Sequence, residues 1–307
     1  MKKFKKISNI KQLREIVGIV LGAPIIQEQD SAIYIVDENI SALLKPRERL
    51  SHKGTYGHAL LMAGSYGKIG AALLSAKACL RSGVGLLTTN VPKCGYDIMQ
   101  IPIPESMCLT DENHNVLTTL TDITGYSAIG IGPGIGTDAL TSQMLANLLK
   151  TSIQPLVLDA DAINILSANQ EFIGLLSENT ILTPHIKEFD RLVGKSKNTT
   201  ERLEKQIEFS KKHKCILVLK DAYTSVSSIE GNLYFNTTGN QGMATAGSGD
   251  TLTGIITGLL AQGYEPLTAA IIAVYYHGKA GDDAVKLRSY SSMIASDIIE
   301  NLNIVNS

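Results

Sequence analysis

A run of small residues that ends in a carboxylate, residues 240–250, is the part of the sequence best suited to chemistry. Its last four residues are Gly247, Ser248, Gly249 and Asp250. Small residues leave backbone N–H groups free to face a ligand, and a helical pattern over residues 251–260 adds the positive end of a helix, so the segment suits a phosphoryl group or a developing oxyanion. Asp250 stands where a carboxylate commonly caps a helix. It also stands where a base could take a proton from a hydroxyl that attacks phosphorus.

Other polar or glycine-rich segments follow the short apolar runs of the chain. They are residues 64–70, 132–136, 159–164, 183–188, 220–224 and 239–250. In open parallel sheets ligands bind at the carboxyl ends of the strands, so these six loops are expected to converge on one edge. None is specific alone. Lys220 at a strand end is commonly only solvated, and Asp159 and Asp161 could cap the next helix or bind a metal through oxygen.

Two glycine-rich loops do not fit the common nucleotide-binding patterns. Residues 64–69 fail the P-loop pattern, because Lys68 is followed by Ile rather than Ser or Thr. Residues 130–135 place Ile135 where the dinucleotide pattern G-x-G-x-x-G needs its last glycine. Dinucleotide binding of the Rossmann type is therefore disfavoured, and tight strand-to-helix turns are the alternative interpretation of both loops.

The elements that must position these loops alternate along the chain. Strands are expected over residues 58–63, 85–91, 127–131, 155–158, 180–182 and 215–219, with a hairpin over 225–235. Helices are expected over residues 71–82, 139–149, 162–166, 188–193, 200–212 and most of the chain beyond 249. Uniformly apolar strands between helices are typical of a parallel sheet covered on both faces. No linker divides the chain, so one α/β domain is predicted, and residues 93–126 are expected to be a surface excursion.

Composition excludes several classes of protein. The 28 Lys and Arg balance 29 Asp and Glu, and aromatic residues are 5% with no Trp, which disfavours a nucleic-acid partner. The four cysteines are far apart, so zinc fingers, Fe–S clusters and disulfide scaffolds are not expected. No run reaches the ~18–20 apolar residues that cross a bilayer. Residues 16–26 imitate a signal peptide, but charged residues separate them from the basic start and Pro24 interrupts them, so a cytoplasmic protein is expected.

Taken in order, the segments resemble the ADP/ATP-dependent NAD(P)H-hydrate dehydratases, a branch of the ribokinase-like superfamily. The resemblance runs from about Ser51 to Asp297. Its motifs are residues 52–57, 70–72, 81–83, 130–134, 158–161, 183–185, 219–220, 240–254 and 276–278. The Gly-Ser-Gly-Asp run alone indicates only the superfamily, whereas residues 52–57 and 183–185 favour the dehydratase branch.

The resemblance implies a ribokinase-like three-layer α/β/α sandwich with a mainly parallel central sheet. The chain would be a single domain, residues 1–307, with its dehydratase core over residues 51–300. Residues 1–50 would be an N-terminal extension, for which a helix and an oligomer contact are expected. The family often stands behind an epimerase domain, and about fifty residues are too few for one, so a stand-alone bacterial type is predicted.

The implied activity is repair of the (6S)-hydrates of NADH and NADPH. ADP would phosphorylate the ring hydroxyl with Mg²⁺ on its phosphates, and elimination of phosphate would return NADH or NADPH with AMP as the other product. Bacterial members use ADP, whereas eukaryotic members prefer ATP. The implied partners are these small molecules, a separate epimerase and further copies of the chain, with a tetramer favoured and neither nucleic acid nor membrane.

The resemblance also assigns roles to residues by position. Asp250 would be the base on the hydrate hydroxyl, and the backbone amides of residues 246–249, which include Gly247, Ser248 and Gly249, would form the anion hole. The adenine nucleotide would be held by Lys220, Asp221, Ala222, Tyr223, Thr224 and Gly249. The hydrate would contact Ala71, Gly132, Gly134, His185 and Asp250. Many relatives carry Gly where this chain has Asp221, so the nucleotide loop departs from the family pattern, and no metal ligand is assigned.

Two alternatives remain open on the sequence. A ribokinase-like kinase acting on a small alcohol, such as a thiamin precursor, would use the same Asp250 and anion hole, but its product would keep the phosphate. A non-catalytic nucleotide sensor would bind nucleotide without turnover. Replacing Asp250 by Asn separates the sensor from an enzyme, because only an enzyme would lose its function.

Overall fold

Eleven strands form one sheet in the part of the chain that the structure describes, residues 4–7 and 32–304 of a computed structural model. The strands are β1 (Lys5–Ile7), β2 (Ile33–Val36), β3 (His58–Met62), β4 (Leu86–Val91), β5 (Met107–Thr110), β6 (Ala128–Ile131), β7 (Leu156–Leu158), β8 (Ile181–Leu182), β9 (Ile216–Leu219), β10 (Ser225–Ser227) and β11 (Leu233–Asn236). Their order across the sheet is β1–β2–β11–β10–β9–β8–β7–β6–β3–β4–β5. Only β1 and β10 among them run antiparallel to their neighbours, which confirms the mainly parallel sheet.

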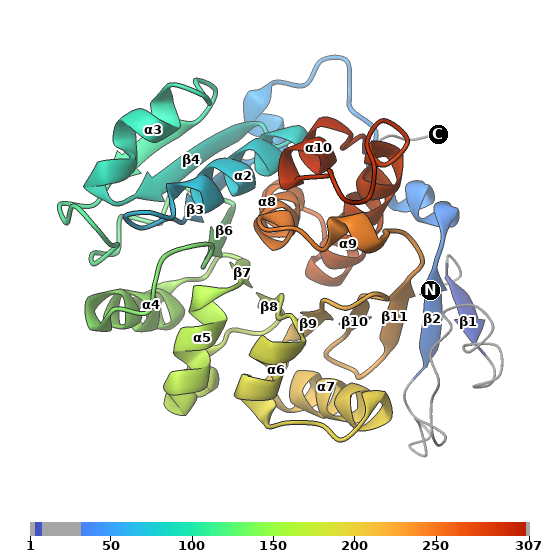
Figure 1. The fold of residues 1–307 in the computed structure, drawn as a ribbon. Coiled ribbons are helices and arrows are strands. Elements are labelled where there is room, and N and C mark those ends of the chain that lie inside the picture. Colours follow the sequence, from blue (N-terminus) through green and yellow to red (C-terminus); the bar gives the residue numbers. More distant parts are fainter. Residues whose placement is uncertain (1–3, 8–31, 305–307) are drawn as a thin grey trace.

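Helices cover both faces of this sheet and complete the three layers (Figure 1). They are α2 (Ile69–Arg81), α3 (Tyr96–Gln100), α4 (Ala139–Thr151), α5 (Asp161–Ala168), α6 (Ile186–Val193), α7 (Thr199–His213), α8 (Ser248–Ala261), α9 (Pro266–Ala284) and α10 (Ala295–Glu300). One face carries α2, α3, α8, α9 and α10, and the other carries α4 to α7. The predicted α/β/α sandwich is confirmed.

Alternate residues of the central strands feed two separate cores. In β3, Ala59 and Leu61 pack with the side chains of α2 and α8. Leu60 and Met62 of the same strand pack with those of α4 and α5. All four are fully buried, because helices cover both faces of the sheet. This explains why the strands are uniformly apolar and do not alternate with polar residues.

Helix α8 is buried along almost its whole length against the sheet, α2 and α9. Gly254 allows the close approach to α2, since a Cβ there would stand 2.1 Å from the carbonyl oxygen of Ser75. Gly258 repeats the contact one turn later, where a Cβ would stand 2.0 Å from Ser82 Oγ. The two contacts fix the axis of α8 and so the place of its first residues.

The prediction that residues 93–126 are only a surface excursion is wrong in part. They contain α3 and β5, and β5 extends the sheet beyond β4. Met99, Ile103 and Leu117 of this stretch are buried. The signal was weak because β5 is an edge strand of four residues, largely exposed and without an alternating pattern.

The described part of the N-terminal region adds strands to the sheet, and the helix expected within residues 1–50 stays a prediction. Residues 4–7 and 32–50 form β1, β2 and a 3₁₀ helix over Glu38–Leu43. Strand β2 joins the sheet beside β11 in parallel register, with Ile33 opposite Leu233. Residues 8–31, with the apolar stretch 16–26, lie outside the described residues. Nowhere in residues 4–7 and 32–304 is there a helix with the length and apolar character of a membrane span.

Candidate active site

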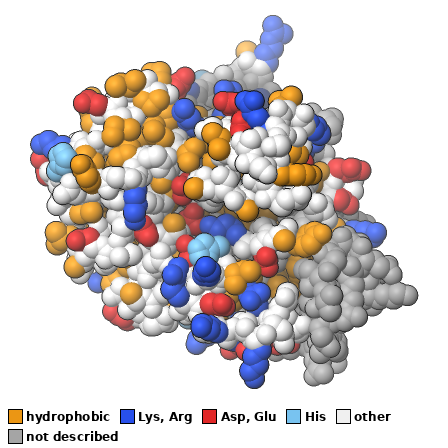
Figure 2. Space-filling model, in the orientation of Figure 1, with side chains coloured by type: hydrophobic (Ala, Val, Ile, Leu, Met, Phe, Trp, Pro, Cys, Tyr) orange, Lys and Arg blue, Asp and Glu red, His pale blue; other side chains and the backbone are white. Residues whose placement is uncertain are grey.

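The loops that follow β3, β6, β7, β8 and β9 meet at one edge of the sheet. The Gly64 N–H donates to the carbonyl oxygen of Pro133 at 2.8 Å, which joins the loops after β3 and β6. The Lys220 N–H donates to the carbonyl oxygen of Pro184 at 2.9 Å, which joins the loops after β8 and β9. In Figure 2, basic, acidic and histidine side chains gather near the middle of the visible face, over the region where β8 and β9 lie in Figure 1. The predicted convergence is confirmed for these loops.

The start of α8 faces this edge with an open backbone. Gly247 precedes the helix in the left-handed conformation, with φ of 87°, and a Cβ there would stand 2.3 Å from Leu74 Cδ1. The first N–H groups of a helix have no intrahelical acceptor and carry partial positive charge, so the N–H groups of Gly249 and Asp250 are available to an anion, whereas the Ser248 N–H donates to the carbonyl oxygen of Thr245 at 3.4 Å. Helix α8 begins at residue 248, three residues before the expected start.

Asp250 is half-buried in the first turn of α8, and its environment resists ionisation. Burial is the main cause that raises its pKa to about 7 from 3.8, and the Asp159 carboxylate raises it further. Asp161 and Glu188 act in the same direction, whereas the Lys220 ammonium opposes them. The N-cap of α8 is Gly247, three residues before Asp250, so the interpretation of Asp250 as the N-cap is wrong. A carboxylate that is half ionised near neutral pH is suited to act as a general base.

Asp159 follows β7 and is almost completely buried, with 1% of its surface exposed. Its Oδ1 accepts from Lys220 Nζ at 2.7 Å, and its Oδ2 accepts from Thr253 Oγ1 at 2.7 Å. Lys220 Nζ in turn lies 3.1 Å from the point where a Cβ on Gly249 would stand. A lysine at the end of β9 therefore holds its ammonium against the first turn of α8, and it is not merely solvated.

Asp161 is the first residue of α5, two residues after Asp159. Its Oδ2 accepts from the Gly136 N–H at 2.8 Å and pairs with Lys68 Nζ at 3.4 Å, and its Oδ1 accepts from Asn164 Nδ2 at 3.2 Å. Within residues 4–7 and 32–304, no three His, Cys, Asp or Glu side chains form a group that could hold a metal. The interpretation of Asp159 and Asp161 as metal ligands has no support in these contacts.

The residues predicted to contact the hydrate surround the loop after β6. A Cβ on Gly134 would stand 3.1 Å from Ala71 Cβ, so these two residues face each other. Gly132 lies against the backbone of Asp159, where a Cβ would stand 1.8 Å from the carbonyl oxygen. His185 is the N-cap of α6, and its Nδ1 accepts from the Glu188 N–H at 3.2 Å. Its imidazole is about half exposed and lies beside the strand that ends in Lys220.

The predicted nucleotide loop forms the turn between β9 and β10. Asp221 Oδ1 accepts from the Ala222 N–H at 2.7 Å. Thr224 Oγ1 donates to the carbonyl oxygen of Asp221 at 3.3 Å, so the loop closes on itself. Tyr223 of this loop is 40% exposed. Lys220 of this loop lies at the start of α8, with Nζ 3.1 Å from the point where a Cβ on Gly249 would stand.

Two residues of the site carried no role in the sequence interpretation. Thr253 lies one turn beyond Gly249 on α8, and only the fold brings it to Asp159. His277 of α9 lies behind Ser248, with Nε2 3.4 Å from the hydroxyl oxygen. Burial lowers the pKa of His277 to about 4, so the ring is neutral near pH 7. The motif over residues 276–278 was the available signal for His277.

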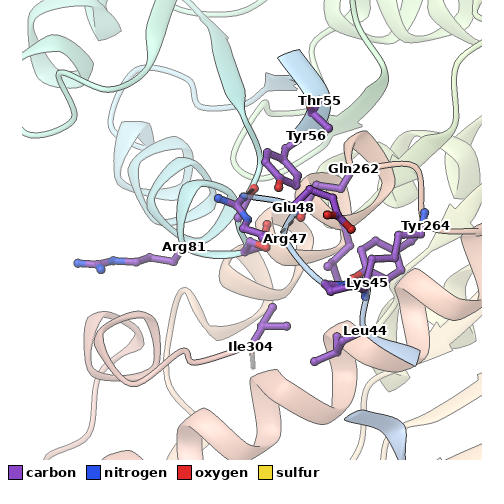
Figure 3. Close-up of a pocket in the computed structure, with 14 residues that line it drawn as sticks. Leu44, Lys45, Arg47, Glu48, Thr55, Tyr56, Arg81, Gln262, Tyr264 and Ile304 are labelled. Atoms are coloured by element: carbon purple, nitrogen blue, oxygen red, sulfur yellow. Dashed lines mark hydrogen bonds between the residues drawn. The ribbon is translucent and has the colours of Figure 1, made fainter. Parts of the chain in front are cut away.

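A cavity of about 390 Å³ lies at the opposite edge of the sheet, near the start of β3 and the end of α8 (Figure 3). The Arg47 guanidinium lies over the Tyr56 ring at 3.9 Å and donates to the carbonyl oxygen of Gly83. Lys45 Nζ lies 4.7 Å from the centre of the Tyr264 ring. None of the residues predicted for catalysis or binding lines this cavity. The family motif over residues 52–57 also lies here, so its role is to pack β3 on the end of α8.

The sheet order, the helices on both faces and the glycine-rich start of α8 define a ribokinase-like protein. The structure is similar to a ribokinase-like superfamily protein from Enterococcus faecalis, with a TM-score of 0.77, 29% identity, and coverage of 90% of this chain and 95% of that one. A hydroxyethylthiazole kinase from Pyrococcus horikoshii shares the fold, with a TM-score of 0.61 at 16% identity. A family model described as NAD(P)H-hydrate dehydratase matches residues 59–303. The chain belongs to the NAD(P)H-hydrate dehydratase family.

This chain is similar both to bifunctional repair enzymes and to shorter proteins that are dehydratases alone. A bifunctional NAD(P)H-hydrate repair enzyme from Moorella thermoacetica is 38% identical over 269 residues, which cover 84% of this chain and 51% of that protein. The chain therefore spans about half the length of such bifunctional relatives. The ADP-dependent (S)-NAD(P)H-hydrate dehydratase of Bacillus subtilis is 33% identical over 268 residues, which cover 87% of this chain and 95% of that protein. A crystal structure of the Bacillus subtilis ADP/ATP-dependent enzyme, co-crystallised with ATP and Mg²⁺, has a TM-score of 0.74.

Proposed function

We propose that the protein is a hydro-lyase that dehydrates (6S)-NADH hydrate and (6S)-NADPH hydrate with ADP as phosphoryl donor. The observation that carries the proposal is the place of Asp250, a carboxylate with a pKa of about 7 in the first turn of α8, beside the Lys220 ammonium. The family and the single sheet that joins strands from residue 5 to residue 236 support one repair domain. We place it in the cytoplasm.

The reaction begins with attack of the ring hydroxyl on the β-phosphorus of ADP. Asp250 takes the hydroxyl proton as the O–P bond forms, and the bond to AMP breaks. Hydroxide is a poor leaving group and phosphate is a good one, so the ring nitrogen lone pair then expels phosphate as the C–O bond breaks. Loss of a proton from the neighbouring ring carbon restores the reduced nicotinamide. The products are NADH or NADPH, AMP and phosphate.

The protein contributes alignment and charge stabilisation. The N–H groups of Gly249 and Asp250 face the transferred phosphoryl group, where a helix start stabilises negative charge. Lys220 adds a full positive charge at the same place. Ala71, Gly134 and His185 border the side where the hydrate ring is expected, so that its hydroxyl meets Asp250. Holding donor and acceptor in line supplies much of the catalysis of phosphoryl transfer.

Magnesium would bind mainly through the donor. Both oxygens of Asp159 are engaged by Lys220 and Thr253, and the described residues offer no group of three metal-binding side chains. Mg²⁺ commonly binds through substrate phosphates and water with few protein ligands. When bound, it would neutralise phosphate charge, and the roles of Asp250 and Lys220 do not require a set of protein ligands around the metal.

The nucleotide and partner assignments belong to the same proposal. Lys220, Asp221, Ala222, Tyr223 and Thr224 are proposed to hold the adenine nucleotide, since Lys220, the first residue of their turn, lies against Gly249 in the first turn of α8. We propose ADP rather than ATP as the donor, because the relatives from Bacillus subtilis and Listeria monocytogenes are ADP-dependent (S)-NAD(P)H-hydrate dehydratases. We also propose a homo-oligomer, with a tetramer favoured, and a separate epimerase that supplies the (6S) form.

Recovery of absorbance at the reduced-nicotinamide band tests the activity. Purified protein, chemically prepared NADH hydrate and Mg²⁺ are mixed with ADP or ATP, and AMP and phosphate are measured in parallel. Recovery with ADP, lost in Asp250→Asn while ADP still binds, supports the reaction and the base. Recovery only with ATP overturns the donor. A phosphorylated product without release of phosphate identifies a kinase, and nucleotide binding without any reaction identifies a sensor.

A further inference from the structure

We propose that Asp159 and Thr253 are positioning residues that hold the Lys220 ammonium over the first turn of α8, where it stabilises the phosphoryl group in transfer. The inference rests on the proposed function and adds two residues to its machinery. Asp159 was interpreted from sequence only as a cap or a metal ligand, and Thr253 had no role. Neither is expected to touch the substrate, because both act through Lys220.

The geometry is a chain of three contacts from the sheet to α8. Thr253 Oγ1 donates to Asp159 Oδ2 at 2.7 Å, Lys220 Nζ donates to Asp159 Oδ1 at 2.7 Å, and Nζ lies against Gly249. Thr253 also approaches the carbonyl oxygen of Gly249 at 3.3 Å. Each carboxylate oxygen therefore has one donor, and the carboxylate cannot turn without losing both. The end of β9 and the first turn of α8 are tied to the same buried group.

The carboxylate is fixed from its own backbone as well. Ala160, which follows it, has φ of 47° and ψ of −115°, a conformation that L-residues rarely adopt. Gly132 presses against the Asp159 backbone from the neighbouring loop. Rare backbone conformations persist where the surrounding structure holds them, and they concentrate at functional sites. The Asp159 side chain is buried and accepts from Lys220 and Thr253, and it does not cap α5.

The lysine needs such a holder because its side chain is long and flexible. Its side chain is only 20% exposed although it ends in a charge, and Asp159 Oδ1 is the one acceptor that Nζ has among the described residues. An ammonium has three donors. Two therefore remain for phosphoryl oxygens at the start of α8. A lysine without its carboxylate would extend toward solvent and lose this place.

The test uses four single variants of the full chain. Thr253→Val removes only the hydroxyl and is expected to lower kcat about tenfold, the loss of one hydrogen bond to a charged group. Thr253→Ser keeps the hydroxyl and is expected to restore most of the rate. Thr257→Val is the matched control, since this buried threonine lies one turn further along α8 and donates to the carbonyl oxygen of Thr253. Asp159→Asn is expected to lower kcat about 100-fold.

A double variant separates positioning from packing. If Thr253 acts through Lys220, Thr253→Val lowers kcat in the wild-type background and has little further effect in Lys220→Met. Equal losses in both backgrounds would overturn the proposal. So would a Thr253→Val variant with wild-type kcat, or a Thr257→Val variant that loses as much. If circular dichroism shows that Thr253→Val does not fold, the same double-mutant comparison is made with Asp159→Asn and Lys220→Met.

The pH profile gives a second readout that packing alone would not move. The charged groups that face Asp250 are Asp159 after β7, Asp161 on α5, Glu188 on α6 and Lys220 at the end of β9, with neutral His277 of α9 behind Ser248. The Asp159 charge raises the pKa of Asp250 more than the Lys220 ammonium lowers it, so the acidic limb of the kcat profile moves to lower pH in Asp159→Asn even when Lys220 leaves its place. An unmoved limb contradicts the arrangement.

Failure of the proposed function is distinguishable from failure of this inference. If the wild-type protein dehydrates no hydrate, NMR titration of the Asp250 carboxyl and calorimetry with ADP still test whether Asp159 and Thr253 position Lys220. Asp159→Asn then lowers the pKa of Asp250, and Thr253→Val weakens ADP binding by several-fold while Thr257→Val does not. An unchanged pKa and unchanged ADP affinity overturn the positioning role whatever the reaction is.

Discussion

Replacing Asp250 by Asn is expected to abolish turnover and, at the same time, to stabilise the protein at alkaline pH. The folded pKa of about 7 lies roughly three powers of ten above the ordinary value of 3.8, because burial and the Asp159 carboxylate disfavour the ionised form. At ~1.4 kcal/mol for each power of ten, ionised Asp250 lowers the free energy of unfolding by about 4 kcal/mol. The folded state binds the proton more tightly than the unfolded state. Stability is therefore lost as pH rises from about 4 to about 7, and the loss is complete above that range.

The measurement is urea unfolding of the wild-type protein and Asp250→Asn at pH 5 and pH 8. Asparagine has nearly the same shape and no charge to bury, so the variant should gain about 3 kcal/mol relative to the wild-type protein between these two values. Activity of the wild-type protein should rise over the same range, since the base must be ionised. A stability difference that does not change with pH would refute the assigned burial of the charge. An active variant would refute the role of the base.

Three further substitutions test separate parts of the site. Gly249→Ala places a Cβ 3.1 Å from Lys220 Nζ and should lower kcat at least tenfold in the absorbance assay, with the fold retained by circular dichroism. Lys68→Ala should raise KM for the hydrate several-fold with little change in kcat, because Lys68 borders Gly134 and faces Asp161; an unchanged KM would exclude it from the hydrate side. His277→Gln should reduce the loss of stability between pH 6.5 and about 4, because burial keeps His277 neutral and the folded state resists its protonation; identical urea midpoints across this range would contradict that.

Local patterns predicted the elements and the edge of the sheet that carries the site. The apolar run 155–158 predicted β7, and the glycine-rich run before residue 251 predicted the start of α8, because strand burial and helix starts leave short-range signals. The contact between Thr253 and Asp159 joins residues 94 positions apart, and no local pattern reports it. The strand β5 was missed for a similar reason. Edge strands are defined by their neighbour and not by burial on both faces.

The family motif over residues 52–57 shows how a sequence signature and its role can separate. It favoured the dehydratase branch, yet it lies at the opposite edge of the sheet from Asp250 and packs the start of β3. Gly57 has φ of 72°, and a Cβ there would stand 1.8 Å from the carbonyl oxygen of Ala261. The motif therefore stabilises the far end of α8, the same helix whose first turn forms the candidate site.

The position of β2 in the sheet has a consequence for the order in which the chain can fold during synthesis. Its parallel partner is β11, and the Ala32 N–H donates to Asn232 Oδ1 across a separation of 200 residues. At ~5–20 residues per second, a ribosome needs about 10–40 s to make the intervening chain. Strands β1 and β2 are thus the first to be synthesised and among the last to find a place in the sheet. A nascent chain halted before residue 233 would carry them without their partner strand.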